Sequence, residues 1–191
     1  HYTSRAPGGT VGSLMLLLGI DIGSSSVKTA LLRNGRIVGR THSCDFGTRY
    51  EGVRVEVEPD ELLQAMSRAI RAAGPTARKV DAIALSSMSP SWVAMDRRGR
   101  AITPVITHQD RRSIEVARRI ERAIGKARHL RLVGCRPFPG GISSTTCAWF
   151  GEHHPGVLAR ADLVGHISTL VHRLTTGARV TDPSNASFMG L

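Results

Sequence analysis

The first strongly apolar segment is residues 16–22, Leu-Leu-Leu-Gly-Ile-Asp-Ile. A continuous apolar run of this length is typical of a central strand that is covered on both faces. Residues 27–33 also have the composition of a strand, and the Asn34-Gly35 pair that follows is a strong signal for a hairpin turn. Residues 36–41 then predict a third strand. The chain is therefore expected to open with three antiparallel strands.

After this group the apolar spacing changes to that of a helix. Pro59 is tolerated in a first helical turn, and acidic residues at 60 and 61 suit a helix amino end. Apolar residues recur at helical spacing from Leu62 to Ala73, and Gly74-Pro75 ends the pattern. These features predict a helix that begins at about residue 59.

The rest of the chain alternates shorter strands and helices. We expect strands at 80–85, 92–95 and 102–106, helices at 114–124, 145–153 and 161–175, and a loop at 136–141. Strands in a hairpin group, followed by alternating helices and strands, predict an α/β fold with a mixed sheet and flanking helices. This order is typical of the actin-like, ribonuclease-H-like domains that bind nucleotide phosphates.

Length and composition indicate one globular domain. The 191 residues are 41% hydrophobic and 21% charged, which is enough apolar material for a core. Residues 1–14 are polar, glycine-rich and without periodicity, so we predict a disordered extension there and the domain over 15–191. No apolar run reaches the roughly 18 residues of a membrane span, and no signal-peptide pattern occurs. We therefore expect a cytoplasmic protein without a membrane partner.

The net charge of +11 invites a nucleic-acid interpretation. The basic residues are nearly all arginines, they are spread along the chain, and no aromatic residues are interleaved with them. The densest stretch, residues 111–131, has the alternation of a solvated helix face. We predict no nucleic-acid partner. The three cysteines are widely spaced without a Cys-x-x-Cys pair, so reduced thiols are expected rather than a disulfide or zinc site.

The sharpest chemical signal is the string from Gly19 to Lys28, Gly-Ile-Asp-Ile-Gly-Ser-Ser-Ser-Val-Lys. Its central glycine permits a tight turn and close approach to a ligand, and amides and hydroxyls of the serines can form an anion-binding concavity. The aspartate can hold a hydrated Mg²⁺ beside phosphates. The predicted phosphate-binding residues are Asp21, Gly23, Ser24, Ser25, Ser26 and Lys28, with Asp21 also the metal ligand. A plain serine-containing hairpin capped by Asp21 has the same local pattern.

Five segments, in order, resemble the FGGY carbohydrate kinases. They are Gly19–Lys28, Val80–Asp96, Ile102–Ser113, Cys147–Pro155 and His172–Ser187. The resemblance is to xylulose-kinase-like members and covers nearly all of residues 16–191. It implies the amino-terminal lobe of an actin-like ATPase fold, incomplete in this chain. It also implies that ATP, with Mg²⁺, phosphorylates a hydroxyl of a small sugar, a ketose or polyol.

The resemblance also implies a substrate site. Its residues would be Ser89, Pro90, His108, Asp110, Arg112 and Gly141, with Gly140 in the same closing loop. Ser89 and Pro90 stand where xylulose kinases have Met-His and glycerol kinases have Arg-Glu. His108 stands at the usual tryptophan. These departures imply that the hydroxyl groups of the acceptor are recognised differently here.

The general-base aspartate of the family is expected beyond Leu191, so we predict that this chain alone is inactive. A non-catalytic sugar- or nucleotide-sensing module of the same fold is the alternative. A nuclease of ribonuclease-H topology would need several acids around two metals, and near the first strand only Asp21 is available. Exposed surface makes a homodimer possible. Trp149 is predicted to pack in the core, and Asp182 and Asn185 to form a turn and helix cap.

Overall fold

The structure is a computed structural model that describes residues 15–190. The extension predicted at residues 1–14 lies outside the described residues. The strands are β1 Leu16–Ile22, β2 Ser26–Arg33, β3 Arg36–Asp45, β4 Arg49–Glu51, β5 Arg54–Val57, β6 Ala82–Ser87, β7 Ser91–Met95, β8 Val105–Thr107 and β9 Leu163–Gly165. The helices are α1 Pro59–Ala72, the 3-10 helix η1 Pro75–Lys79, α2 Ile114–Ile124, α3 Lys126–Val133, α4 Ser143–His153, α5 Pro155–Arg160, α6 Ile167–Thr176 and α7 Pro183–Ala186.

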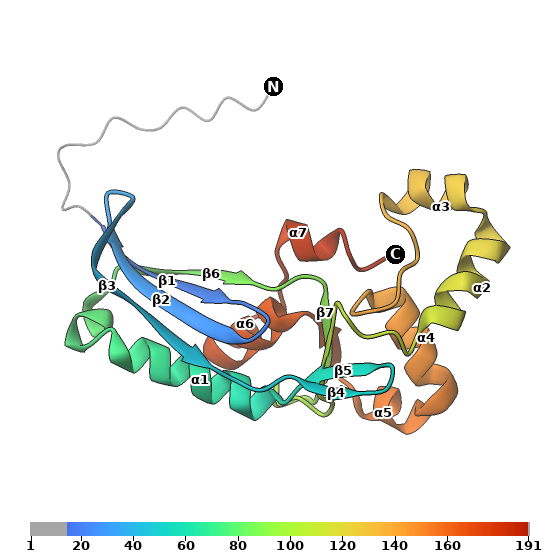
Figure 1. Cartoon of the computed structure of the whole chain (residues 1–191), viewed down its shortest axis with the longest axis horizontal. Helices are drawn as coiled ribbons and strands as arrows, with labels where there is room; N and C mark the ends of the chain where they lie inside the picture. The colour runs from blue at the N-terminus through green and yellow to red at the C-terminus, as the bar shows by residue number, and fades with distance from the viewer. Residues whose placement is uncertain (1–14, 191) are drawn as a thin grey trace.

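The first sheet has the strand order β3-β2-β1-β6. β1 to β3 are antiparallel neighbours, and Asn34 (φ 54°) and Gly35 (φ 71°) form the hairpin turn that the sequence predicts. β6 returns parallel to β1 because α1 carries the chain across the sheet between them. The carboxyl ends of β1 and β6 therefore lie at the same edge, as Figure 1 shows.

The second sheet has the order β4-β5-β8-β7-β9 and is antiparallel. The second sheet lies next to the first along the long axis of the molecule, and helices α2 to α5 lie on its far side (Figure 1). None of the helices between residues 15 and 190 is long and apolar enough to cross a membrane.

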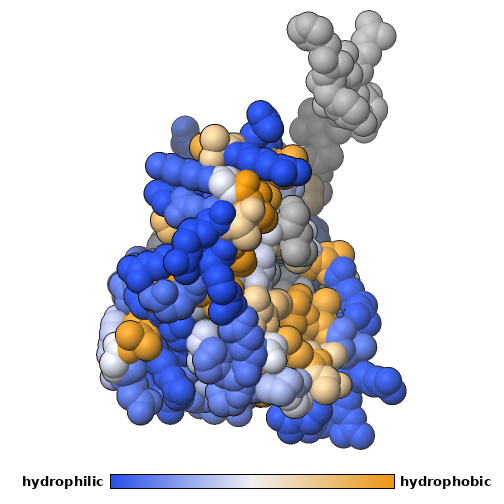
Figure 2. Space-filling view, turned by 90° about the vertical axis from the view of Figure 1, so that its right-hand side faces the viewer, coloured by the Kyte–Doolittle hydropathy of each residue, from blue (hydrophilic) through white to orange (hydrophobic). Residues whose placement is uncertain are grey.

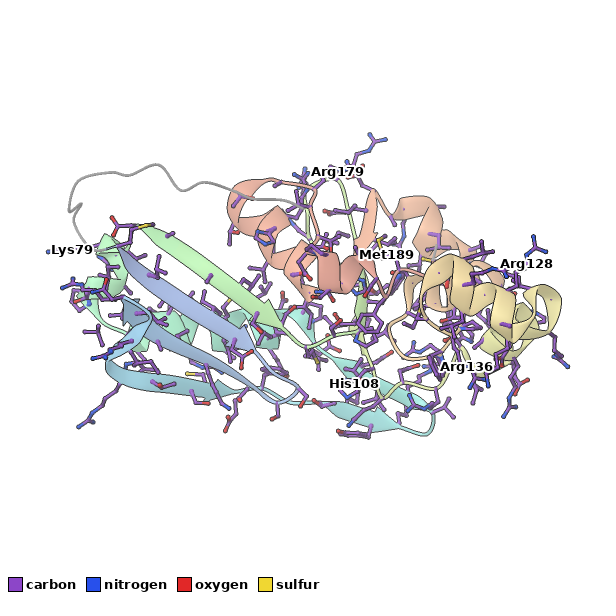
Figure 3. The ribbon with its side chains drawn as sticks, turned by 90° about the horizontal axis from the view of Figure 1, so that it is seen from above. Lys79, His108, Arg128, Arg136, Arg179 and Met189 are labelled. Carbon is purple, nitrogen blue, oxygen red and sulfur yellow. The ribbon has the colours of Figure 1, made fainter. Side chains whose placement is uncertain are left out.

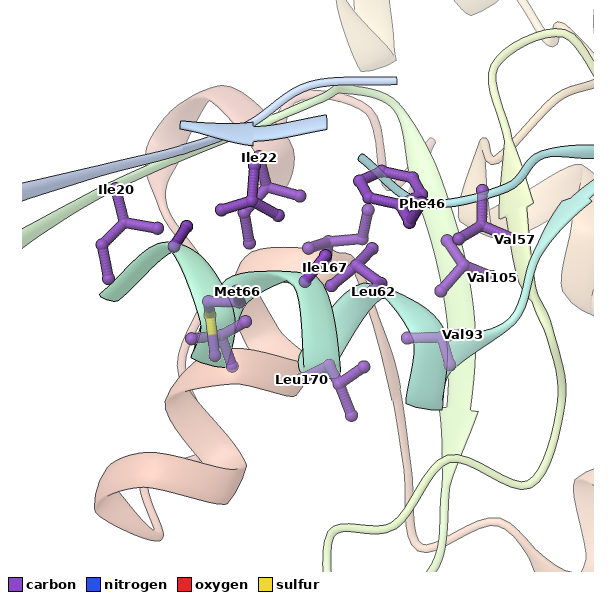
Figure 4. Close-up of a cluster of buried hydrophobic side chains, with 14 of the residues drawn as sticks. Ile20, Ile22, Phe46, Val57, Leu62, Met66, Val93, Val105, Ile167 and Leu170 are labelled. Carbon is purple, nitrogen blue, oxygen red and sulfur yellow. The ribbon is translucent and has the colours of Figure 1, made fainter. Parts of the chain in front are cut away.

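Two apolar clusters hold these parts together. In the larger one, shown in Figure 4, Ile20 and Ile22 of β1 pack against the apolar face of α1 at Leu62 and Met66, because alternate β1 residues point to that face. In the smaller one Trp92 stacks on Phe150 with ring centroids 4.7 Å apart. Trp149 also belongs to it and is 8% exposed, which confirms the predicted core position.

Two local predictions need correction, and several elements were not predicted. The helix predicted at 161–175 is instead strand β9 followed by α6, because residues 163–165 pair with β7. The strand predicted at 102–106 is β8, Val105–Thr107. The β4–β5 hairpin and helices α3 and α5 were not predicted. Residues 53–57, Val-Arg-Val-Glu-Val, alternate apolar and charged side chains as a strand does, so β5 could have been predicted. Helix α3 is rich in charged residues and mostly exposed, so it lacks the apolar periodicity that identifies a buried element.

Candidate functional site

The site begins where β1 and β6 end together. Ile22 is the register partner of Ser87, and the Met88 amide donates a hydrogen bond to the Ile22 carbonyl oxygen at 2.7 Å. Open α/β sheets bind ligands just beyond the carboxyl ends of their parallel strands. Two predicted segments leave the sheet here, the 23–26 turn after β1 and the Ser89-Pro90 pair after β6.

The 23–26 turn is fixed through its main chain. The Gly23 amide donates to the Ser26 carbonyl at 2.9 Å, and the Phe46 amide donates to the Ser25 carbonyl at 3.0 Å. The Thr48 hydroxyl donates to the Ser24 carbonyl at 3.1 Å. The side chains of Ser24 and Ser25 are exposed at the sheet edge. A turn held by its carbonyl groups in this way can present hydroxyls to an anionic ligand.

Asp21 lies beside this turn on the face of the sheet away from α1. It is exposed, and its register partners are Lys28 on β2 and Ser86 on β6. All three line an open hollow of about 400 Å³. The predicted acid and cation are therefore brought together at one end of a concave surface.

These residues fit a hydrated magnesium ion bound with phosphates. In residues 15–190 no three His, Cys, Asp or Glu side chains gather into a metal cage. Asp21 is a single accessible carboxylate, and Mg²⁺ commonly uses one or two carboxylates with water and substrate phosphates as its other ligands. Asp21 is the residue that would hold it.

A second hollow, of about 410 Å³, is lined by Pro90 of the Ser89-Pro90 segment. Its polar side chains are His108 and Arg111. Its apolar side chains include Pro90, Ile114, Phe138, Ile142 and Phe188. Pro90 is two residues from Met88, so no more than about 7 Å of chain separates this hollow from the bond to Ile22. We call it the acceptor hollow.

Gly140 lines the acceptor hollow, and Gly141, predicted for the same role, follows it without lining the hollow. Both have φ of +83°, a conformation that favours glycine. A Cβ on Gly140 would lie 2.8 Å from the His108 carbonyl carbon, and one on Gly141 would lie 2.8 Å from the Ser91 Cα. The loop is therefore pressed directly against the main chain that carries His108 and follows Pro90.

His108 lies near the middle of the long axis, with Lys79 at one end of the molecule and Arg128 at the other (Figure 3). Its side chain lines the acceptor hollow, and its buried Nδ1 has no hydrogen-bond partner among the described residues. A buried ring nitrogen without a partner is costly unless a ligand satisfies it.

Asp110 and Arg112 have a different place from the one predicted. Asp110 is fully buried and accepts hydrogen bonds from the Val55 amide at 2.8 Å and from the Arg112 guanidinium, while Glu56 pairs with Arg112 at 2.5 Å. Burial lowers the pKa of Arg112, but the hydrogen bonds with Asp110 and Glu56 outweigh it and leave the pKa raised. Arg112 also lies 5.2 Å from the Trp149 ring. The pair joins the segment after β8 to β5, and neither residue lines the hollow.

Ser89 turns away from the acceptor hollow into a polar network. Its hydroxyl donates to the Asn185 side-chain oxygen at 2.8 Å, and the Asn185 amide donates to Asp182 at 2.8 Å, which confirms the predicted cap. Burial raises the pKa of Asp182, but hydrogen bonds from Asn185 and Ser168 outweigh it and lower that pKa to about 2. The network ties α6 and α7 to the segment between β6 and β7.

This network gives a pH-dependent prediction. Because the folded pKa of Asp182 is below its ordinary value, its contribution to stability is present above about pH 4 and is lost as pH falls through about 2. We expect Asp182→Asn to lower the free energy of unfolding at pH 6 and to flatten its decline between pH 4 and 2. Urea unfolding at several pH values measures this, with the exposed Asp45→Asn variant as control. Parallel curves for wild type and Asp182→Asn would contradict the assignment.

The structure thus brings Asp21 and Lys28 to one hollow, with the 23–26 turn next to Asp21 and outside the lining. It brings Pro90, His108 and Gly140 to the other hollow, which the predicted residues Ser89, Asp110, Arg112 and Gly141 do not line. It also supplies lining residues that sequence reasoning missed, above all Arg111, Phe138 and Phe188. A large aromatic residue inside a Pro/Gly loop is unusual, and this is the sequence signal that could have indicated Phe138 as a lining residue. In the structure its side chain is 51% exposed.

Sequence comparison identifies the class of protein that has this architecture. The family model described as FGGY family of carbohydrate kinases, N-terminal domain, matches residues 16–191. The chain belongs to this family. The resemblance found in the sequence is confirmed, as is the α/β fold of the actin-like type.

Individual relatives are sugar and polyol kinases. A glycerol kinase from Methylobacterium nodulans is 33% identical over 90% of this chain and 36% of its own length. The structure of xylulose kinase from Rhodospirillum rubrum matches with TM-score 0.84 and 22% identity, over 92% of this chain and 37% of that one. The Plasmodium falciparum glycerol kinase with ADP matches with TM-score 0.83 and 18% identity, over 96% and 38%. The chain spans little more than a third of the length of these relatives.

Proposed function

We propose that this chain forms the phosphate-binding turn and the acceptor hollow of an ATP-dependent kinase that phosphorylates a hydroxyl of a small polyol or ketose. One observation carries the proposal. The turn beside Asp21 and the hollow beside Pro90 leave the same sheet edge, joined by the bond from the Met88 amide to the Ile22 carbonyl. A phosphate donor and a hydroxyl acceptor bound at these two places would be neighbours.

The chemistry of phosphoryl transfer supports this arrangement. Catalysis rests on positioning the two substrates and stabilising charge on the moving phosphoryl group. The exposed turn with Lys28 can bind the phosphates, and Asp21 can hold Mg²⁺, which neutralises their charge. The family and the kinases named above agree with ATP as donor. A cytoplasmic location, a homodimer and the absence of a nucleic-acid partner stay predictions.

The direct test is acceptor-dependent ADP formation. We expect the protein that carries this chain in its natural full length to release ADP from Mg-ATP only when a suitable polyol or ketose is present. Glycerol, xylulose and longer alditols form a first panel. If titration calorimetry showed sugar binding and no acceptor stimulated ADP release, the sensing module would replace the kinase.

The isolated chain should behave differently from the full-length protein. We expect residues 15–191 alone to release ADP at no more than the background rate, because an open half-site neither excludes water nor orients the attacking hydroxyl. A coupled ADP assay at matched concentrations of fragment and full-length protein measures this. Acceptor-dependent turnover by the fragment would show that all the catalytic groups lie within it.

A further inference from the structure

His166 is a polar side chain in the interior of the protein. Polar residues normally lie at the surface, and Figure 2 shows the end of the molecule that carries α2 and α3 as mainly hydrophilic, with hydrophobic residues gathered in one area. His166 departs from this rule, because it is only 1% exposed. It stands between β9 and α6 and lines neither the hollow beside Asp21 nor the acceptor hollow. A buried imidazole outside both hollows requires an explanation.

The two ring nitrogens of His166 have different surroundings. Nδ1 is hydrogen-bonded to the Ser91 carbonyl oxygen. A carbonyl oxygen only accepts, so Nδ1 carries the hydrogen. Nε2 is buried and has no hydrogen-bond partner among residues 15–190. Burial lowers the pKa of His166 and outweighs the opposing effects of the Ser91 carbonyl and the Asp182 charge, so the ring is neutral near pH 7.

This arrangement has a cost that the Nδ1 bond must offset. A buried nitrogen without a partner destabilises the folded protein, and a leucine, which has a similar size, would avoid that loss. What a histidine supplies here and a leucine does not is the N–H directed at the Ser91 carbonyl. The role of His166 is therefore to be sought at Ser91.

Ser91 is the first residue of β7 and follows Pro90, which lines the acceptor hollow. Besides the bond from His166, the Ser91 hydroxyl accepts from the Ile167 amide at 3.1 Å, so both bonds come from the start of α6. Ser89, on the other side of Pro90, is hydrogen-bonded to α7. Pro90 has no N–H with which to fix its own position, and it lies between two anchored residues.

We propose that His166 is a positioning residue for the acceptor. Its Nδ1–H holds the Ser91 carbonyl and thereby fixes Pro90 at the wall of the acceptor hollow. The 23–26 turn should be independent of this bond, because it is anchored to the segment that follows β3. His166 therefore acts on the binding of the acceptor and not on that of the nucleotide. The proposal rests on the proposed kinase function.

Two variants of the full-length protein test the N–H itself. His166→Leu keeps the volume of the side chain and loses the donor, whereas the asparagine of His166→Asn can place an N–H near the position of Nδ1. With glycerol or xylulose as acceptor, His166→Leu should raise the acceptor KM at least about tenfold and change kcat and the KM for Mg-ATP less than about threefold. His166→Asn should recover most of the loss. Equal acceptor KM values in the two variants would overturn the proposal.

Thr103→Val is the matched control for damage to β7. Thr103 is 7% exposed, and its hydroxyl accepts from the Ala94 amide at 3.1 Å. This variant therefore also removes one buried hydrogen bond to the main chain of β7, toward the end of the strand away from Pro90. We expect its acceptor KM to stay within about threefold of the wild-type value. A rise equal to that of His166→Leu would indicate a general loosening of the strand and would contradict the positioning role.

Two further measurements separate this proposal from the kinase function. NMR of the histidine ring nitrogens in isotope-labelled full-length protein, assigned by the signal that His166→Asn removes, should show the Nδ1–H tautomer near pH 7. The Nε2–H tautomer would overturn the proposal even in an active kinase. If the wild type released ADP with no acceptor, the kinase function would fail, and the calorimetric Kd for glycerol and xylulose would replace KM. Weaker binding by His166→Leu than by Thr103→Val would then support the role of His166, and equal or undetectable binding would overturn it.

Discussion

Replacing Asp21 with asparagine is expected to lower kcat of the full-length protein by at least about 100-fold, the usual cost of losing one electrostatic contact to a transferring group. Asparagine keeps the size of the side chain and removes the charge that would hold Mg²⁺ beside the phosphates. Asp21 is exposed at the end of β1, and no hydrogen bond to its side chain is found within residues 15–190, so folding should be preserved. Steady-state ADP formation at saturating acceptor, with Mg²⁺ varied, measures the effect.

The matched control for this change is Asp45→Asn. Asp45 is also exposed, and it is the register partner of Ser26 at the same end of the sheet. The two variants therefore lose the same charge close to the turn, and only Asp21 lines the hollow beside Lys28. We expect Asp45→Asn to keep kcat within about threefold, because an exposed charge that contacts neither substrate is largely screened. Equal losses in both variants would indicate a general charge effect and would remove Asp21 from the site.

Gly140→Ala should have the largest structural effect. Gly140 has a left-handed backbone conformation, in which an alanine is less stable than glycine by about 1–2 kcal/mol. Its Cβ would also collide with the main chain of His108. We expect the free energy of unfolding to fall by about 2–4 kcal/mol in total. The displaced loop would carry Phe138 with it, so the KM for the acceptor should rise at least about tenfold.

Gly177→Ala separates the two causes. Gly177, at the end of α6, is left-handed with φ of +74°, and the nearest atom to the position its Cβ would take is Arg173 Nη1 at 3.9 Å, an ordinary contact. Its substitution should cost only the conformational part, about 1–2 kcal/mol, and leave the acceptor KM unchanged. Chemical unfolding and acceptor titrations of both variants give the comparison. If Gly140→Ala resembled Gly177→Ala in both measurements, the loop would not be pressed against the site as described.

The sequence specified the parts of the fold whose signals are local. The apolar run of β1, the Asn34-Gly35 turn and the helix that begins at Pro59 are each determined by neighbouring residues, and the structure contains all three. The single helix predicted at 161–175 failed because β9 exists only through its pairing with β7. Such long-range pairing leaves little trace in a three-residue segment.

The sequence predicted the kinds of residue that form the site better than it predicted which side chains line the hollow. The order Gly-Ile-Asp-Ile-Gly-Ser-Ser-Ser indicated a turn beside an acid, and the structure places both at the sheet edge. In the segment from His108 to Arg112, the choice of which arginine is buried depends on Glu56 and Trp149, which are distant in sequence. Sequence reasoning therefore selected Arg112 for the substrate, whereas Arg111 is the one that lines the hollow.

The most direct test of the proposed site is a crystal structure of the full-length protein with Mg²⁺, a non-hydrolysable ATP analogue and the polyol or ketose that best stimulates ADP formation. We expect the terminal phosphate against the 23–26 turn, the metal or its water on Asp21, and the acceptor in the hollow between Pro90 and His108. A nucleotide bound away from the ends of β1 and β6, with the acceptor hollow occupied by neither substrate, would contradict the site and the function built on it.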